Sequence, residues 1–139
     1  RQVLADRYLG MGRYEAARPL QERALAVRRE RLGPDHPDTL ASQVALGNLL
    51  MQMGQLDAAQ PLLEDALNRQ RRVLGNDDPG TLNSLNALGI IHYMRGDLAK
   101  AEPYLREAAG ITYVIAAQVD PRSVKTRHGP EQLYSAISL

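Results

Sequence analysis

Three neighbouring side chains in the stretch LGPDHPDTL, which begins at Leu32, could do chemistry. Asp35, His36 and Asp38 bring two carboxylates and an imidazole together, a set that can bind a metal ion or transfer a proton. The choice between such a site and a structural role depends on whether the same set recurs elsewhere in the chain.

A second copy of this stretch, LGNDDPGTL, follows after 74 − 32 = 42 residues. In this copy Asp78 replaces His36 and Gly80 replaces Asp38, so the set itself is not kept. The parts that persist are a polar residue, a Pro directly after it and a Thr two positions after the Pro. A polar N-cap accepts a backbone N–H, and Pro suits the first helical position because its missing N–H is not needed there. We therefore interpret His36 and Asp78 as helix N-caps.

The remaining polar residues show no catalytic pattern. His36, His92 and His128 lack a second ligand at the H-x-x-x-H spacing of a zinc-binding helix. The sequence gives no argument for a catalytic triad of Ser, His and an acid, and it contains no Gly-rich phosphate loop. We predict a protein that is not an enzyme and that holds no metal and no cofactor, with His92 as a packed, hydrogen-bonded ring.

Two groups of arginine could bind phosphate or an acidic peptide: Arg28, Arg29 and Arg31, and then Arg69, Arg71 and Arg72. Acidic neighbours offset their charge, and exposed charges usually serve solvation. We expect a solvated outer face here. An accessory domain of an enzyme that contacts a nucleotide or phosphate through these arginines is the alternative.

The composition excludes several classes of protein. The chain has 139 residues, which suits one domain, and its 17 basic and 16 acidic residues give no strong field for nucleic acid or an anionic membrane. No apolar run is long enough to span a membrane. There is no Cys, which fits a reducing compartment, so we expect a cytoplasmic protein. The first residues read as the middle of a helix, so we expect a piece of a longer protein.

The 42-residue frame extends over most of the chain. Gly12, Gly54 and Gly96 keep this spacing, as do Pro37, Pro79 and Pro121. Each unit holds two helical patterns, near 37–53 and 56–74 in the second copy, and a Gly where the first helix must turn. Small residues such as Gly47 and Gly89 leave room for a helix to cross closely. The two helices of each unit run antiparallel, and successive units stack because no single unit can bury its apolar face.

These residues resemble the tetratricopeptide repeat. Its pattern of W-x2-L-G-x2-Y followed by A-x3-F corresponds to Leu85-x2-Leu88-Gly89-x2-His92 and then Ala101-x3-Leu105. The 42-residue period, with "DHPDTL" between repeats and "AEP" in the second helix, is similar to the kinesin light chain type, which many bacterial proteins also carry. The resemblance covers about residues 1–120. It implies an all-α, right-handed α-solenoid of antiparallel helix hairpins.

The resemblance also implies that the first helix of each repeat lines a concave face, where an extended or helical segment of a partner protein would dock. Amide side chains there suit a peptide backbone, and Met and Tyr could supply apolar anchors. The residues expected on this face are Gln2, Asp6, Val44, Asn48, Met51, Gln52, Asn83, Asn86, Ile90 and Tyr93. Only Asn86 matches the family's peptide-binding Asn, and Val44 departs from it.

The frame weakens after Ala108, where a charged surface gives way to the apolar run GITYVIAA at 110–117. The alternative function is therefore self-association into a homodimer through Ile111, Tyr113, Val114 and Ile115. Cover by the chain's own last helix, which carries Leu133, Tyr134 and Ile137, is slightly favoured over such a dimer. A short helix near 121–127, capped by Asp120, and a last helix near 130–138 are expected.

The sequence thus predicts a single tetratricopeptide-like domain that serves as a non-catalytic scaffold for a protein or peptide partner, within a larger regulatory protein. Its repeats are expected at 1–36 (a truncated first repeat), 37–78 and 79–120, with a divergent partial repeat or cap at 121–139.

Overall fold

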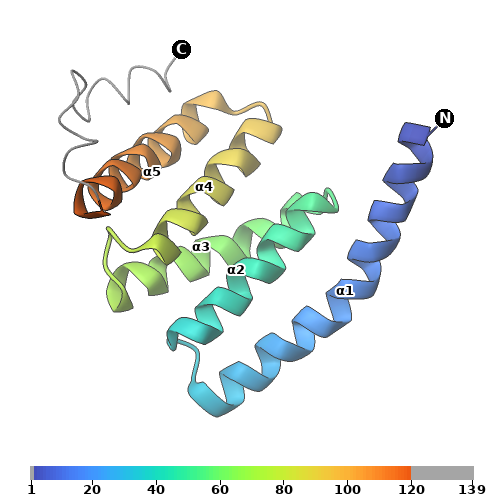
Figure 1. Ribbon diagram of the computed structural model, residues 1–139, viewed down its shortest axis with the longest axis horizontal. Helices are drawn as coiled ribbons and strands as arrows, with labels where there is room; N and C mark the ends of the chain where they lie inside the picture. Colours follow the sequence, from blue (N-terminus) through green and yellow to red (C-terminus); the bar gives the residue numbers. More distant parts are fainter. Residues whose placement is uncertain (1, 120–139) are drawn as a thin grey trace. The chain divides into compact units, whose positions relative to one another are not determined.

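The computed structural model describes residues 2–119, with side chains from Gly10 to Gln118. These residues form five α-helices and no strand: α1 (Gln2–Leu32), α2 (Pro37–Gln52), α3 (Leu56–Val73), α4 (Pro79–Met94) and α5 (Leu98–Val119). Figure 1 shows their order along the chain. The prediction of an all-α helical repeat is confirmed. The helices and the cap expected from Asp120 onward lie outside the described residues.

The chain divides into two compact units, Arg1–Ala66 and Leu67–Leu139, and the division falls within the continuous helix α3. Unit 1 contains α1, α2 and the first part of α3. Unit 2 contains the end of α3, α4 and α5, and in Figure 1 α4 and α5 lie side by side and antiparallel. The proposed repeat boundaries and the single domain stay predictions.

The predicted caps are confirmed. His36 has extended backbone dihedrals, and its Nδ1 accepts a hydrogen bond from the Asp38 N–H at 3.1 Å. Asp78 does the same for α4, where its Oδ1 accepts from the Gly80 N–H at 2.8 Å. Each cap is followed by a Pro that begins the helix. The side chain of His36 that looked chemical is therefore engaged in starting α2.

The turn after α2 confirms the role expected of Gly54. Gly54 has a φ of 79°, in the left-handed region that favours glycine. The Gln55 N–H donates to the Leu50 carbonyl at 2.8 Å and the Gly54 N–H donates to the Met51 carbonyl at 3.0 Å, the two bonds of a Schellman motif. The turn after α4 repeats this geometry at Gly96, with a φ of 78°.

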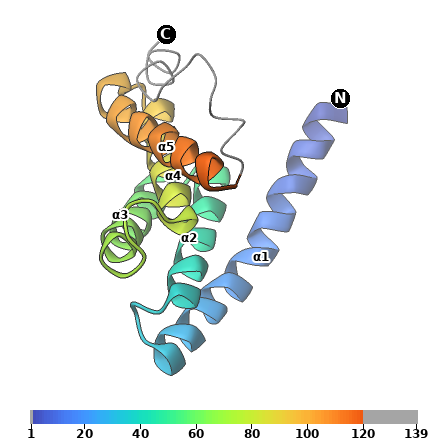
Figure 2. The ribbon, with the colours of Figure 1, turned by 60° about the vertical axis from the view of Figure 1, so that its left-hand side comes forward.

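The expected turn at Gly12 is wrong, because α1 runs without a break through both Gly10 and Gly12. Neither glycine has a positive φ. In both Figure 1 and Figure 2 the N-terminal half of α1 extends away from α2 as a single helix. The sequence offers a reason: Arg13 stands where Asp97 begins the second helix of its hairpin, and Asp97 Oδ1 accepts from the Lys100 N–H at 3.1 Å. An arginine has donors only, so it cannot cap a new helix.

Close helix crossings at the predicted small residues hold each hairpin together. A Cβ placed on Gly47 would lie 2.7 Å from Leu63 Cγ, and one placed on Gly89 would lie 2.6 Å from Leu105 Cδ2. Both glycines are buried, and Leu63 is fully buried. The leucine of each second helix thus occupies the space that a side chain on the first helix would need.

Candidate functional site

The exposed face of α4 is the part of unit 2 that best fits a binding surface. Asn83, Asn86, Ile90 and Tyr93 are all exposed and follow one another at spacings of three and four residues, which places them on one face of the helix. Ile90 is 43% exposed and Tyr93 is 64% exposed, which is high for apolar and aromatic side chains. We call these four residues the α4 stripe.

The opposite face of α4 is firmly anchored in the core of unit 2. Leu85, Leu88 and Ile91 are fully buried. Ser84 donates to Gln70 Oε1 at 2.5 Å, and both side chains are buried, so the bond satisfies two polar groups that would otherwise be costly to bury. The α4 stripe therefore stands on a helix whose rotation is fixed by both apolar packing and a buried hydrogen bond.

The C-terminal end of α4 is held by a ring contact. His92 is 7% exposed and stacks on Tyr104 of α5, with 5.5 Å between ring centroids and an angle of 11° between the planes. This confirms that His92 is a packed ring. His92 is buried against α5, whereas the next residue, Tyr93, lies about 100° further around α4 and is exposed. The stack therefore helps to fix the direction in which Tyr93 faces.

The stripe has no acidic or basic side chain. The 16 residues of α4 include no Asp, Glu, Lys or Arg. The neighbouring α5 contrasts with it, since its first half contains Lys100, Glu102, Arg106 and Glu107. The chemical character of the α4 stripe is thus amide and apolar, which suits hydrogen bonds to a peptide backbone and contacts with apolar side chains.

The residues of unit 1 that were predicted to bind a partner differ from one another in their exposure to solvent. Asn48 and Met51 of α2 are half-buried and Gln52 is exposed. Val44 is the clear error, because it is only 5% exposed and belongs to the core of its unit. The equivalent residue one repeat later is Asn86, which is exposed, whereas the aliphatic side chain of Val44 packs in the core. Gln2 and Asp6 lie in α1, outside the residues whose side chains are described.

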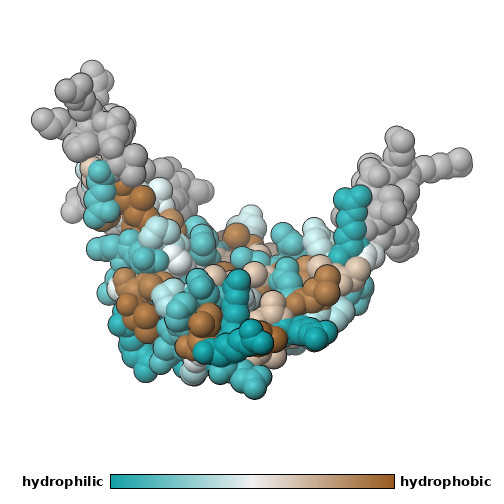
Figure 3. Space-filling model, turned by 60° about the horizontal axis from the view of Figure 1, so that its bottom comes forward, coloured by the Kyte–Doolittle hydropathy of each residue, from teal (hydrophilic) through white to brown (hydrophobic). Residues whose placement is uncertain are grey.

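Two further exposed apolar residues follow the stripe closely in the chain and were missed. Met94 is 52% exposed and Leu98, at the start of α5, is 61% exposed. Met94 stands 42 positions after Gln52, which the sequence did place on the binding face, so the repeat frame contained the signal. Hydrophobic residues elsewhere are interspersed with hydrophilic ones on the face that Figure 3 draws.

The other candidate sites are a metal site and the two groups of arginine. Among the described residues no group of three or more His, Cys, Asp or Glu is placed to hold a metal ion. Arg28 donates to Ser42 Oγ at 2.6 Å and Arg29 donates to Gln43 Oε1 at 3.2 Å, so both arginines tie α1 to α2. We expected these arginines only to face solvent, but Arg28 and Arg29 also form hydrogen bonds that hold two helices together.

The apolar segment 110–117 is less exposed than a free adhesive patch would be. Ile111 is only 3% exposed and belongs to the core, which corrects its place among the self-association residues. Tyr113, Val114 and Ile115 are half-buried. The last helix, with Leu133, Tyr134 and Ile137, lies outside the described residues. No helix between residues 2 and 119 is both long enough and apolar enough to cross a membrane.

Comparison with known proteins decides the family. Two tetratricopeptide repeat profiles match, one over residues 38–112 and the other over residues 1–38. The chain belongs to the tetratricopeptide repeat family. Together the two matches run from residue 1 to residue 112, and the first alone covers more than half of the chain.

Solved structures identify the repeats as the kinesin light chain type. A crystal structure of nearly identical TPR-like repeats, described as those of a kinesin light chain from Podosopora anserina, is 30% identical with a TM-score of 0.68, and a point variant of the same repeats is 31% identical with a TM-score of 0.67. In both cases the similarity covers 78% of this chain and 51% of the other. BtubC (BKLC) from P. vanneervenii, at 16% identity and a TM-score of 0.67, shares the fold over 91% of this chain and 59% of its own.

The tetratricopeptide chain described here spans about half the length of the solved structures that it matches. No curated protein matches it. Repeats of this family form protein-interaction scaffolds that are typically non-catalytic, and the chain is a scaffold of that general kind.

Proposed function

We propose that this tetratricopeptide module binds a segment of a protein partner along the α4 stripe, without catalysis and without a cofactor. The observation that supports the proposal most directly is the stripe itself: two exposed amides followed by an exposed Ile and Tyr on one face of a rigid helix. An apolar patch with convergent polar groups is a usual form of binding site.

Each part of the stripe has a distinct role in this proposal. Asn83 and Asn86 donate and accept hydrogen bonds with the main chain of the partner segment. Ile90 and Tyr93 provide apolar anchors, and aromatic anchors contribute much of the binding energy in protein interfaces. Because α4 is capped at both ends and packed on α5, the entropy cost of ordering falls mainly on the partner.

The lack of charge on α4 restricts the kind of partner. Ion pairs cannot supply the contacts made by this helix, so the partner segment presents uncharged and apolar side chains to it. Exposed charge pairs weaken as salt increases, whereas apolar contacts do not. We therefore expect the complex to persist at salt concentrations that dissociate charge-driven complexes.

In unit 1 the equivalent helix α2 presents Asn48, Met51 and Gln52, and we extend the proposal to these residues. Val44 is left out because it is buried. We also place the module in the cytoplasm of a cell, because none of the 139 residues is Cys.

The test is capture of partners by the whole chain and by a variant with Asn48→Ala and Asn86→Ala. The proposal predicts that the double variant recovers the partners more weakly while its helical circular dichroism and unfolding midpoint are unchanged. Equal recovery of the same partners by both proteins would reject it.

The alternative is self-association through Tyr113, Val114 and Ile115, which are half-buried. Sedimentation equilibrium of the whole chain separates the two functions. We expect a mass that does not change with concentration, and a concentration-dependent dimer that Tyr113→Ser dissociates would support self-association instead.

A further inference from the structure

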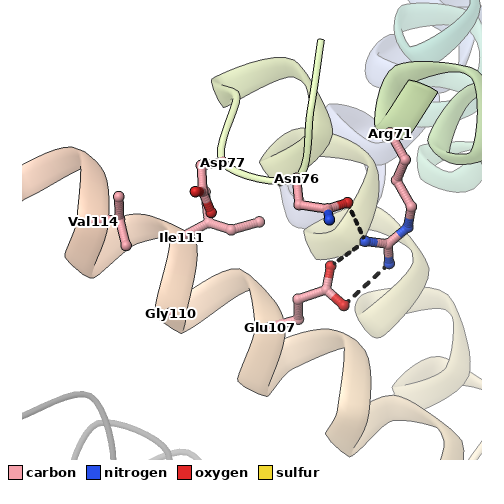
Figure 4. Close-up of a pocket in the computed structure, with 7 residues that line it drawn as sticks. All are labelled: Arg71, Asn76, Asp77, Glu107, Gly110, Ile111 and Val114. Atoms are coloured by element: carbon pink, nitrogen blue, oxygen red, sulfur yellow. Dashed lines mark hydrogen bonds and ion pairs between the residues drawn. The ribbon is translucent and has the colours of Figure 1, made fainter. Parts of the chain in front are cut away.

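A second surface of unit 2 carries a pocket that the proposed function does not use. It has a volume of about 350 Å³ and is lined by residues from the end of α3, the loop before α4 and the middle of α5. Figure 4 shows these residues: Arg71, Asn76, Asp77, Glu107, Gly110, Ile111 and Val114. This volume is within the range of about 300 to 1,000 Å³ that is usual for ligand sites, and one long side chain can occupy it.

One side of the pocket is polar, and its groups already satisfy one another. The Arg71 guanidinium donates to both carboxylate oxygens of Glu107, at 2.6 Å and 3.1 Å, and to Asn76 Oδ1 at 3.0 Å. The positive charge of Arg71 is therefore matched by Glu107, and its donors are in use. An anionic ligand would have to break this pair before it could bind.

Asp77 is the charged group of the pocket that remains available. Its carboxylate is exposed, and within the described part of the chain it has no hydrogen bond or ion-pair partner. Ile111 and Val114 supply an apolar wall to the same pocket. With one matched pair and one unmatched carboxylate, the pocket has a net charge of −1 and one hydrophobic side.

Comparison with the residues 42 positions earlier shows which side chains of the repeat have changed at this pocket. Moving 42 residues back from Asp77 leads to Asp35, which is also acidic, whereas Ile111 and Val114 correspond to Arg69 and Arg72. Each of these three residues of the earlier copy already takes part in an interaction. The later copy thus keeps the acid and replaces both arginines by aliphatic residues.

We propose that this pocket accepts the side chain of an arginine from a partner protein. The guanidinium binds the Asp77 carboxylate, and the aliphatic stem packs on Ile111 and Val114. Arginine suits this combination because its guanidinium is planar, forms bidentate pairs with carboxylates and is weakly hydrated, while its methylene stem covers apolar surface. The incoming arginine supplies one of the two guanidinium groups that the earlier copy of the repeat carries at Arg69 and Arg72.

The site is independent of the proposed function, because the pocket contains no residue of the α4 stripe. A variant of the stripe leaves the pocket intact, and a variant of the pocket leaves the stripe intact. The failure of either proposal can therefore be recognised without reference to the other.

The test uses nuclear magnetic resonance of the whole chain, titrated with N-acetyl-arginine methylamide. The matched control ligand is N-acetyl-citrulline methylamide, which has nearly the same shape and no charge. We expect amide shifts at Asp77, Ile111 and Val114 with the arginine compound and none with the citrulline compound. Equal shifts with both compounds, or shifts confined to other residues, would overturn the proposal.

Two variants complete the experiment. Asp77→Asn keeps the shape of an exposed side chain and should weaken the arginine compound up to about fivefold, which corresponds to the upper end of about 1 kcal/mol for an exposed ion pair. Asp38→Asn, at another exposed acid, should not change the affinity. Val114→Arg restores the arginine of the earlier copy and should abolish the shifts. Unchanged binding by Asp77→Asn contradicts the proposal even if Val114→Arg does not fold.

Discussion

Arg71 near the end of α3 and Glu107 in α5 form a bidentate pair, with N–O distances of 2.6 Å and 3.1 Å. The two residues are 36 positions apart, and the pair links the second helices of successive repeats within unit 2. The side chains are 33% and 40% exposed, so water screens part of the attraction. The pair fixes one side of the arginine pocket as well as the packing of α5.

The first prediction concerns the energy of this pair. Arg71→Ala and Glu107→Ala should each lower the free energy of unfolding, and the double variant should lose less than the sum of the two. We expect a coupling of about 0.5 to 1 kcal/mol, since the pair is bidentate but partly exposed. Urea unfolding of the four proteins measures it. Strict additivity would show that the pair does not contribute to stability.

The second prediction concerns the crossing of α4 and α5. Gly89→Ala places a methyl group where Leu105 Cδ2 and Cγ would lie 2.6 Å and 2.9 Å away. Overpacking typically costs about 1–3 kcal/mol, which exceeds the gain of up to about 1 kcal/mol in helix propensity. Thermal unfolding should show a net loss. The same substitution combined with Leu105→Ala should cost less than the sum of the single changes, and an additive result would exclude the contact as the cause.

The third prediction tests the continuity of α1. A Cβ on Gly12 meets no atom within 4 Å, and its φ is not positive. Gly12→Ala should therefore stabilise the chain by up to about 1 kcal/mol through helix propensity. Gly54→Ala is the matched comparison and should destabilise it, because φ at Gly54 is 79°. A loss of stability with Gly12→Ala would indicate a turn at Gly12 like that at Gly54.

The fourth prediction concerns the cap that first looked like an active site. His36→Ala should lower the free energy of unfolding by about 1 kcal/mol, because the Asp38 N–H would lose its acceptor. His36→Asp should retain most of the stability, since Asp78 performs the same function in the next repeat. If His36→Asp is as unstable as His36→Ala, then the imidazole contributes something other than capping.

The sequence predicted the features that recur and failed where one copy differs. Two copies of the cap and Pro were enough to assign His36 and Asp78 correctly, because N-capping depends on local groups alone. Gly12 was misjudged because a glycine permits a turn without requiring one, and the next residue, Arg13, cannot cap a new helix. The outcome there depended on the neighbour of the glycine and not on the glycine itself.

Contacts between helices were harder to predict. Val44 was placed on the binding face because it aligns with Asn86, yet an aliphatic side chain gains by burial where an amide does not. The Arg71 and Glu107 pair joins residues that are far apart in the chain, so no local pattern pointed to it. A signal did exist: Arg29 and Asp65 stand at the same 36-residue separation one repeat earlier.

Binding of the partner by the α4 stripe can be measured by quantitative capture of partners with stripe and control variants. The stripe variant carries Ile90→Ala and Tyr93→Ala. The control carries Val73→Ala at the end of α3, where an apolar side chain is 44% exposed, against 43% for Ile90. We expect the wild-type chain and the Val73→Ala control to recover the same partners and the stripe variant, while still folded, to lose them. Recovery of the same partners in the same amounts by all three proteins would contradict it.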